Sequence, residues 1–166
     1  MANFRTSEKA KDIMRKMEHL YLYIYDDQTG KKTTKFVNGS TIGYGHLITS
    51  QSEFNSYLSG INEKQALDLF DRDLKPFEDN VNRVNKKSDL KQYEFDALVM
   101  LCFNIGSGNF NGSSVLKINN GIKTPYSNIQ SAFNAWNKSQ GKIMNGLIKR
   151  RKLEGDLYTT GVYKYF

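Results

Sequence analysis

The stretch MEHLYLYIYDDQTGKKTTKFVNGSTIGYGHL, residues 17–47, contains the pattern that decides the fold. Aliphatic and tyrosine side chains alternate over residues 20–25, which is the two-residue period of a β-strand. Residues 33–37 have the composition of a second strand, and Asn38-Gly39 is a strong hairpin signal that leads into a third strand over residues 40–44. The sequence therefore predicts a small three-stranded antiparallel sheet near the N-terminus.

The rest of the chain has the apolar periodicity of helices. Ser7 is placed to cap a first helix that starts at Glu8. The helices expected after the sheet are a long one from residue 62 that Pro76 should kink or end, one from Ser88 or Asp89 to Gly106, one over 114–120, one over 128–137, and one from near Gly146 to just before Gly161. The fold class is therefore α+β, in one domain of 166 residues with lobes at about 13–61 and 62–166.

Composition narrows the class of protein. The net charge of +7 suits an anionic polymer such as nucleic acid or the bacterial cell wall, or else a solvated surface with no specific partner. The lysines are scattered apart from the run at 149–152, which argues against nucleic acid. The first residues have no apolar segment of the kind that signal peptides carry, and no run is long enough to cross a bilayer. The single cysteine, Cys102, lies in an apolar run and is read as a small buried hydrophobe.

Three polar residues of the opening stretch form the candidate catalytic set: Glu18, Asp27 and Thr41. Glu18 lies where the first helix gives way to the first strand, and the negative end of a helix dipole favours a protonated carboxyl that can act as a general acid. Asp27 lies in a polar turn, where a carboxylate stays ionised, and Asp26 beside it is a rival. Taken singly, each residue also fits a plain structural role: an exposed glutamate, a turn aspartate and the end of a glycine-punctuated strand.

His46 ends the run TIGYGH, and it is interpreted as a structural residue paired with a carboxylate. The only other histidine is His19, and no second histidine or cysteine lies at the spacing of metal ligands. We therefore expect neither a metal site nor a cofactor.

Together these residues resemble the phage-type (T4/P22-like) lysozymes of glycoside hydrolase family 24. The resemblance rests on five motifs that run in family order: Glu18 with Asp27 nine residues later, TIGYGHL at 41–47, the long helix with Leu69-Phe70 and Asp73, FDAL at 95–98 leading to FNIG at 103–106, and GLIKRR at 146–151 followed by Glu154. The combination of the first two is highly specific, whereas the other three are weak when taken alone.

The resemblance implies a two-lobed lysozyme-like fold with a cleft between sheet and helices, and hydrolysis of the β-1,4 bond between N-acetylmuramic acid and N-acetylglucosamine in peptidoglycan. Glu18 matches the general acid, Asp27 the catalytic aspartate, and Thr41 the threonine that helps to hold the attacking water. The resemblance also implies inversion at the anomeric carbon.

The resemblance also implies roles for residues outside the candidate catalytic set. Leu47, Phe103 and Asn104 match residues that line the sugar-binding cleft, while His46 and Asp73 match a buried pair that joins the two lobes. One residue of the pair Arg150 and Arg151 should lie near Glu18, and the sequence leaves open which one.

Three features depart from the family pattern. His19 replaces the glycine that usually follows the acid. Thirteen residues separate Asp27 from Thr41, more than in the best-known members, and the extra stretch Lys31 to Gly39 is interpreted as a longer cleft wall or a partner contact. The tail after Tyr158 is short, so no separate wall-binding module is expected.

Three other functions fit the same sequence features. A lytic transglycosylase would act on the same substrate without water, a wall-binding domain would keep the fold without turnover, and a basic nucleic-acid binder would show salt-sensitive binding to DNA. The expected partner is peptidoglycan, with no nucleic acid and no stable membrane insertion, and the chain is expected to be a monomer. Without a signal peptide it would be made in the cytoplasm and act in the periplasm or on the wall, either as a phage endolysin or as a delivered effector domain with an immunity or delivery protein.

Overall fold

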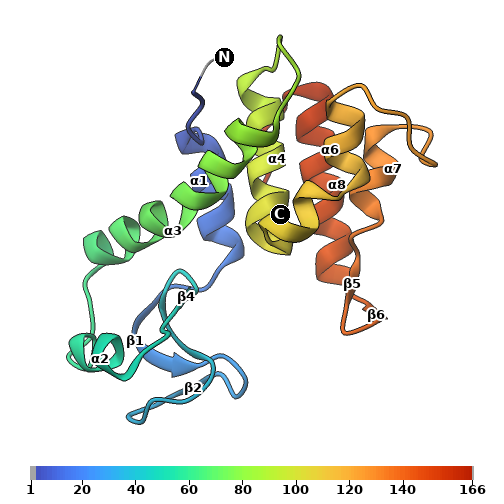
Figure 1. Ribbon diagram of the computed structural model, residues 1–166. Helices are drawn as coiled ribbons and strands as arrows, with labels where there is room; N and C mark the ends of the chain where they lie inside the picture. The colour runs from blue at the N-terminus through green and yellow to red at the C-terminus, as the bar shows by residue number, and fades with distance from the viewer. Residues whose placement is uncertain (1–2, 166) are drawn as a thin grey trace. The chain divides into compact units, whose positions relative to one another are not determined.

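A computed structural model describes residues 3–165 and has the α+β architecture that the sequence predicts (Figure 1). The elements in chain order are α1 (Glu8–Met17), β1 (Tyr21–Asp26), β2 (Lys31–Lys32), β3 (Ser40–Gly43), β4 (His46–Leu47), α2 (Gln51–Ser56), α3 (Glu63–Val84), α4 (Gln92–Ile105), α5 (Ser107–Asn111), α6 (Ser114–Asn119), α7 (Ile129–Asn134), β5 (Lys138–Ser139), β6 (Lys142–Ile143) and α8 (Asn145–Thr160).

The chain forms two compact units. The sheet unit spans Met14–Lys75, and the helical unit combines the residues up to Ile13 with those from Pro76 onwards. The observed boundary at Lys75–Pro76 lies later than the lobe boundary expected near residue 61. The reason is that Ala66 and Leu69, on the first half of α3, belong to the hydrophobic core of the sheet unit.

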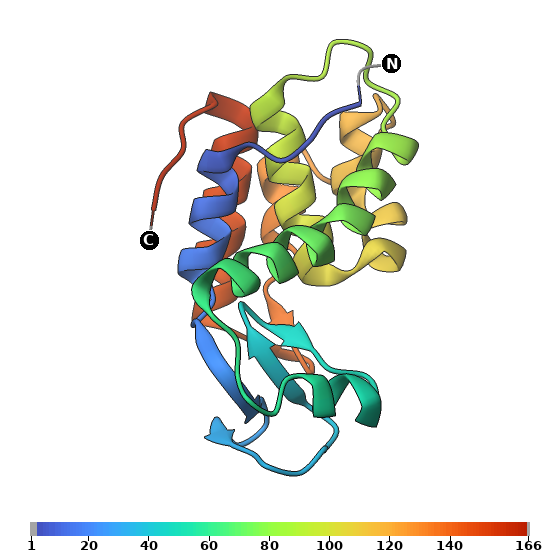
Figure 2. The same ribbon diagram turned by 90° about the vertical axis from the view of Figure 1, so that its left-hand side faces the viewer.

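The sheet unit is built on an antiparallel sheet with strand order β2-β1-β3-β4 (Figure 2). Tyr25 of β1 pairs with Thr41 of β3, and Thr41 pairs in turn with Leu47 of β4. Ile24 and Ile42 point into a core that α2 completes with Phe54. Because aliphatic residues alternate with tyrosines along β1, one face of this strand is buried while the other carries rings.

Two expectations for the sheet are wrong. The sheet has four strands, and the second strand is the short Lys31–Lys32 where residues 33–37 were expected. Phe36 leaves the strand direction to pack against the core, with its ring centroid 5.8 Å from that of Phe54. Asn38-Gly39 does form a turn, closed by a 3.1 Å hydrogen bond from the amide of Ser40 to the carbonyl of Val37, but it leads out of an irregular loop.

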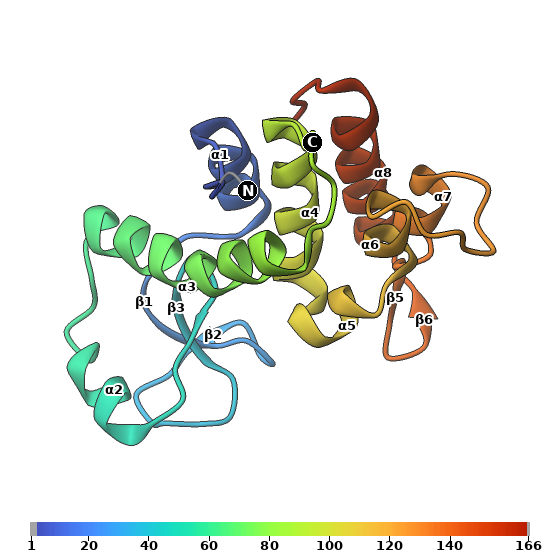
Figure 3. The same ribbon diagram turned by 45° about the horizontal axis from the view of Figure 1, so that its top comes forward.

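The helical unit is centred on α4, which packs against α8, while α8 also packs against α7 (Figure 3). All residues from Glu94 to Cys102 of α4 are buried, which is expected of a helix at the centre of a bundle. Cys102 is fully buried among them, as predicted, and burial raises the pKa of its thiol. No helix of residues 3–165 combines the length and apolarity that a bilayer span requires.

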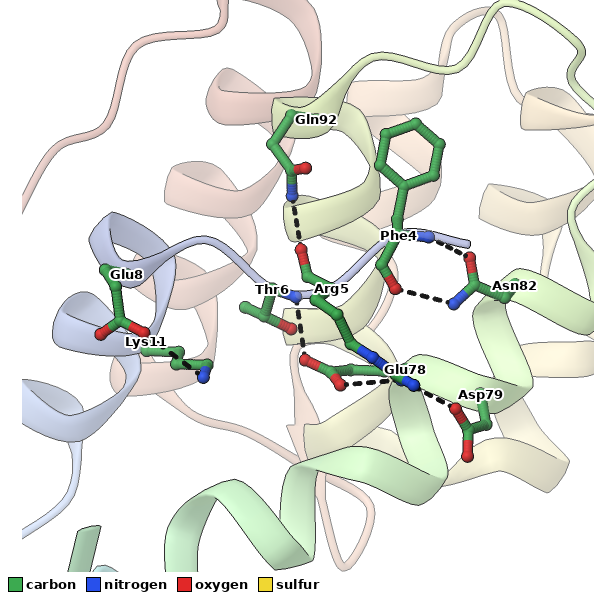
Figure 4. A network of polar contacts seen from close by, with 9 residues as sticks. All are labelled: Phe4, Arg5, Thr6, Glu8, Lys11, Glu78, Asp79, Asn82 and Gln92. Atoms are coloured by element: carbon green, nitrogen blue, oxygen red, sulfur yellow. Dashed lines mark hydrogen bonds and ion pairs between the residues drawn. The ribbon is translucent and has the colours of Figure 1, made fainter. Parts of the chain in front are cut away.

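The segment before α1 is fastened to the helical unit by side chains that bind its backbone (Figure 4). Asn82 accepts a hydrogen bond from the amide of Phe4 and donates one to its carbonyl, at 3.0 and 2.9 Å. Glu78 accepts the amide of Thr6 at 2.9 Å and also pairs with Arg5 at 3.3 Å. These bonds satisfy backbone groups that have no strand or helix partner, so α1 starts from a fixed position.

Helix ends follow the predicted capping residues with two exceptions. Ser7 caps α1, and Asn62 and Gln65 form a reciprocal box at the start of α3 with two 2.8 Å bonds. Of the two outcomes expected at Pro76, a kink or the end of the helix, the second does not occur, because α3 continues to Val84. Helix α4 begins at Gln92, later than Ser88 or Asp89, because the Glu94 side chain accepts the amide of Lys91 at 2.9 Å and fixes the start there.

The sequence analysis missed three short features: helices α2 and α5 and the β5–β6 hairpin. The hairpin turns at Gln140-Gly141, whose φ values of 50° and 77° are those of a tight type I′ connection. Each of these elements is six residues or fewer, and periodicity over so few residues carries little signal.

Candidate functional site

Asp27 and Thr41 meet at a single backbone carbonyl in the sheet unit. The amide of Asp27 donates to the carbonyl oxygen of Gly39 at 3.0 Å, and the hydroxyl of Thr41 donates to the same oxygen at 2.8 Å. Thr41 is only 4% exposed, whereas Asp27 is exposed. The pairing of β1 with β3 therefore brings together two residues that are far apart in sequence, despite the long connection between them.

Gly39 is required at this point for two reasons. Its φ of 106° is a conformation that side chains rarely adopt, and a Cβ built on it would collide with Oδ1 of Asp27. The absent side chain leaves the space into which the Asp27 carboxylate projects. The Asn-Gly pair that the sequence offers as a turn signal thus also shapes the candidate site.

The two neighbouring aspartates have different surroundings. Asp26 accepts a 2.9 Å hydrogen bond from the amide of Gln28 and a 3.3 Å bond from the hydroxyl of Thr29, so its carboxylate is used in the turn. The carboxylate of Asp27 accepts no hydrogen bond and forms no ion pair with residues 3–165. Of the two, only Asp27 keeps its oxygens available for another molecule.

Glu18 directly follows the last residue of α1 and is partly buried, which is where the sequence places it. Its Oε2 lies 3.6 Å from the position that a Cβ on Gly45 would take, so the carboxyl lies beside the glycine turn between β3 and β4. Gly43 and Gly45 have φ values of 67° and 79°, which explains why glycines flank Tyr44.

Tyr25 connects these groups. It pairs with Thr41 across the sheet, and its ring lies 4.0 Å from that of Tyr21. Burial raises the pKa of its phenol, and the charges of Tyr21, Glu18 and Asp27 raise it further. Glu18 lies just before β1, Asp27 directly after it, and Thr41 opposite Tyr25 on β3, so the three residues are gathered along one strand of the sheet unit.

His46 bridges two carboxylates. Its Nδ1 lies 2.8 Å from Oδ2 of Asp73 and its Nε2 lies 2.7 Å from Oε1 of Glu53. The hydrogen bond with Asp73, supported by that with Glu53, raises the pKa of His46 despite partial burial. Because ionised carboxylates only accept, this arrangement favours an imidazolium that donates from both nitrogens. His46 and Asp73 are in contact, but the pair differs from the expected buried link between the lobes: both residues lie in the sheet unit, and their side chains are 12% and 29% exposed.

Glu53 was missed in the sequence analysis. It lies three residues after Ser50, which is the spacing of a capping box, and its amide donates to the Ser50 hydroxyl at 3.1 Å. Its carboxylate also accepts the amide of Thr49 at 3.0 Å. Despite burial, which acts in the opposite direction, the hydrogen bonds from His46 and Thr49 lower the pKa of Glu53. The capping pattern therefore offered a signal for both α2 and this residue.

The residues expected to bind sugar are divided between the units. Leu47 lies on β4 and is 50% exposed. Phe103 and Asn104 lie in the last turn of α4, in the helical unit. The Phe103 ring is 5.2 Å from that of Phe77, and Asn104 is exposed.

The two arginines of α8 differ in burial. Arg151 is fully buried, with its Nε 2.9 Å from Oε2 of Glu154 and its Nη2 2.8 Å from Oδ1 of Asn104. Arg150 is only partly buried. Within residues 3–165, no group of three or more histidine, cysteine, aspartate or glutamate side chains is arranged to hold a metal ion.

Comparison with known proteins gives a consistent result. The model of the phage lysozyme family matches residues 15–154. An endolysin of Bacillus phage PZA is 40% identical over 124 residues, which are 75% of this chain and 45% of the relative. An endolysin of Salmonella phage P22 is 38% identical over 120 residues, which are 71% of this chain and 78% of the relative. The chain thus spans less than half the length of the first of these relatives.

Solved structures extend the similarity to nearly the whole chain. An endolysin from Escherichia coli O157:H7 phage FAHEc1 has a TM-score of 0.75 at 29% identity, with 98% of each chain covered. The muramidase domain of SpmX from Asticaccaulis excentricus has a TM-score of 0.72 at 27% identity and covers 94% of this chain and 98% of that domain.

Proposed function

Because the chain belongs to the phage lysozyme family, we propose that it is a glycoside hydrolase that lyses peptidoglycan. The bond that it cleaves is the β-1,4 link between N-acetylmuramic acid and N-acetylglucosamine. Endolysins and a muramidase among its relatives support this class of activity. The chemistry of Glu18, Asp27 and Thr41 supports the mechanism that follows.

One observation carries the mechanism: the hydroxyl proton of Thr41 is already donated to the carbonyl of Gly39. The Thr41 oxygen can therefore only accept further hydrogen bonds, and the ionised carboxylate of Asp27 also only accepts. A water between them donates one hydrogen to each, which leaves its lone pair free to attack the anomeric carbon. The site is thus arranged to orient a nucleophilic water.

Glu18 acts from the other side of the bond. It donates its proton to the glycosidic oxygen as the C–O bond breaks, while the Asp27 carboxylate stabilises the positive charge on the sugar and takes a proton from the attacking water. The products are a reducing N-acetylmuramic acid end and a free hydroxyl on the leaving sugar. With a water between sugar and carboxylate the reaction inverts the configuration, which requires carboxyl groups roughly 6.5–9.5 Å apart.

Other residues support this reaction. Leu47, Phe103 and Asn104 bind the glycan, and the His46–Asp73 pair has a structural role. We assign to Arg150 the role of the arginine expected beside the acid, since Arg151 is fully buried and bound to Glu154 and Asn104. The chain acts as a monomer on the cell wall without a cofactor, as an endolysin or as a delivered lytic domain with its own delivery or immunity partner.

The assignment is tested with Glu18→Gln, which keeps the shape of the side chain and removes its acid proton. We expect lysis of exposed peptidoglycan, followed as loss of turbidity, to fall by roughly 10²- to 10⁴-fold. Glu63→Gln, at an exposed glutamate of the same unit, should leave lysis unchanged. Full lysis by a folded Glu18→Gln variant would exclude Glu18 as the acid.

Two alternatives make different predictions. A lytic transglycosylase leaves anhydro ends in place of reducing ends, but a water site made of Asp27 and Thr41 has no use in that reaction. A wall-binding domain without turnover would sediment with peptidoglycan. The turbidity of the peptidoglycan suspension would then stay constant with the wild-type protein as well as with Glu18→Gln.

A further inference from the structure

A buried ion pair in the helical unit takes no part in the mechanism above. The side chains of Arg151 and Glu154, on α8, are both 0% exposed. One hydrogen bond and one ion-pair contact join the two side chains: Nη2 donates to Oε1 of Glu154 at 3.1 Å, and Nε lies 2.9 Å from Oε2 without the geometry of a hydrogen bond. Burial raises the pKa of Glu154 to about 7, since the positive charges of Arg151 and Arg150 offset only part of the lost hydration. Removing two charges from water can cost more free energy than their attraction returns, so a contribution to stability is a weak explanation for this buried pair.

The pair has one contact that leads to the surface. Nη2 of Arg151 also donates to Oδ1 of Asn104 at 2.8 Å, and Asn104 is exposed. A guanidinium has only donors, so the amide atom facing it must be the carbonyl oxygen. The planar amide then directs Nδ2 away from Arg151. Nδ2 donates to no acceptor within residues 3–165.

We propose that Arg151, fixed by Glu154, is a positioning residue that locks the amide of Asn104 with its NH2 group directed at the glycan. This inference rests on the proposed function and on Asn104 binding substrate. A locked donor selects an acceptor, and the strongest uncharged acceptors of peptidoglycan are the amide carbonyl oxygens of its N-acetyl groups and of its stem peptides, since its hydroxyl and ether oxygens accept more weakly. Asn104 thus recognises a carbonyl oxygen, and the ion pair prevents its amide from rotating to present the wrong atom.

The choice of arginine agrees with this role. A guanidinium is a rigid fork that binds a carboxylate on one side and reaches another acceptor from the same nitrogen, whereas a lysine ammonium is a point charge on a flexible stem. Arg151→Lys therefore keeps the charge opposite Glu154 but loses the fixed geometry at Asn104.

A double-mutant cycle tests the proposal by measuring KM and kcat on soluble peptidoglycan fragments with Asn104→Ala, Arg151→Lys and the double variant. We expect each single variant to raise KM by about two- to tenfold with kcat nearly unchanged, because one hydrogen bond to substrate is lost or misdirected. The double variant should have the KM of Asn104→Ala, since Arg151 acts only through Asn104. KM effects that multiply in the double variant would overturn the proposal.

A second variant covers the case in which Arg151→Lys fails to fold. Asn104→Asp keeps an oxygen facing Arg151 and removes the outward donor, so it should melt no lower than the wild type and still raise KM. Asn109→Ala, at an exposed asparagine whose amide binds the carbonyl of Ile105, is the matched control and should leave KM unchanged. An unchanged KM in folded Asn104→Asp would overturn the inference while wild-type lysis left the proposed function intact.

Two substrates distinguish whether the carbonyl that Asn104 binds belongs to an N-acetyl group or to the stem peptide. Glycan strands stripped of their stem peptides by an amidase keep the N-acetyl carbonyls, lose the peptide carbonyls, and carry a lactyl carboxylate where each peptide was attached. A KM increase on stripped and intact glycan alike assigns Asn104 to an N-acetyl group, and an increase on intact fragments alone assigns it to the peptide. A wild type that releases no fragments from either substrate would overturn the proposed function itself.

Discussion

Asp26 and Asp27 show how two identical side chains are given different tasks by their hydrogen bonds. The carboxylate of Asp26 accepts from the turn, while that of Asp27 projects into the space left by Gly39. Spacing along the sequence favours Asp27 over Asp26 but gives no chemical reason for the choice. The reason emerges only from the turn geometry, because both residues lie in the same polar segment.

The division between the two aspartates predicts opposite outcomes for two asparagine variants. Asp27→Asn should lower the rate of lysis by roughly 10²-fold or more, because the proposed attacking water then has no base. Asp26→Asn should keep most of the activity and lower the free energy of unfolding by about 0.5–1.5 kcal/mol through weaker turn bonds. Turbidity assays and urea unfolding measure the two effects. Loss of lysis in Asp26→Asn with retention in Asp27→Asn would reverse the assignment.

Among the elements, strong local signals predicted structure well and weak ones did not. The alternation of aliphatic and tyrosine residues correctly predicted β1, and the capping box of Asn62 and Gln65 correctly predicted the start of α3. Each signal combines a pattern with a defined boundary. The expected strand at 33–37 failed because Phe36 gains more by entering the core than by staying in an exposed strand. A single-sequence pattern cannot show such a tertiary contact.

His46 joins three elements of the sheet unit, namely β4, α2 and α3, through Glu53 and Asp73. Its folded-state pKa is raised above the ordinary value of 6.5, so its stabilising effect is fully present below pH 6.5 and is lost as the pH rises through the folded-state pKa. Asp73→Asn should therefore cost about 1–2 kcal/mol of unfolding free energy at pH 5.5, and less at higher pH.

Urea unfolding at a series of pH values measures this effect. Asp68→Asn, at an exposed carboxylate paired with Lys64 one turn away, is the matched control and should show no such dependence. A cost of Asp73→Asn that stays constant from pH 5 to 9 would show that the charge of His46 does not contribute to stability.

At the scale of the whole molecule, the family and the α+β class could be predicted from sequence because the glutamate, the aspartate and the TIGYGH run keep their order, and Glu18 and Asp27 also keep their spacing. The buried Arg151–Glu154 pair and its contact with Asn104 could not, since the sequence alone does not distinguish a buried Arg151 from its neighbour Arg150. Cationic charge of +7 favours encounter with an anionic wall polymer, which agrees with the proposed substrate.

The most direct test of the account is the chemistry of the ends that the enzyme leaves on peptidoglycan cleaved in ¹⁸O-labelled water. Because Asp27 and Thr41 are proposed to orient a water, mass spectrometry of the released muropeptides should show reducing N-acetylmuramic acid ends that carry one ¹⁸O atom. Glu18→Gln should release almost none. Anhydro ends without the label, or no soluble fragments from the wild type, would contradict the proposed hydrolysis.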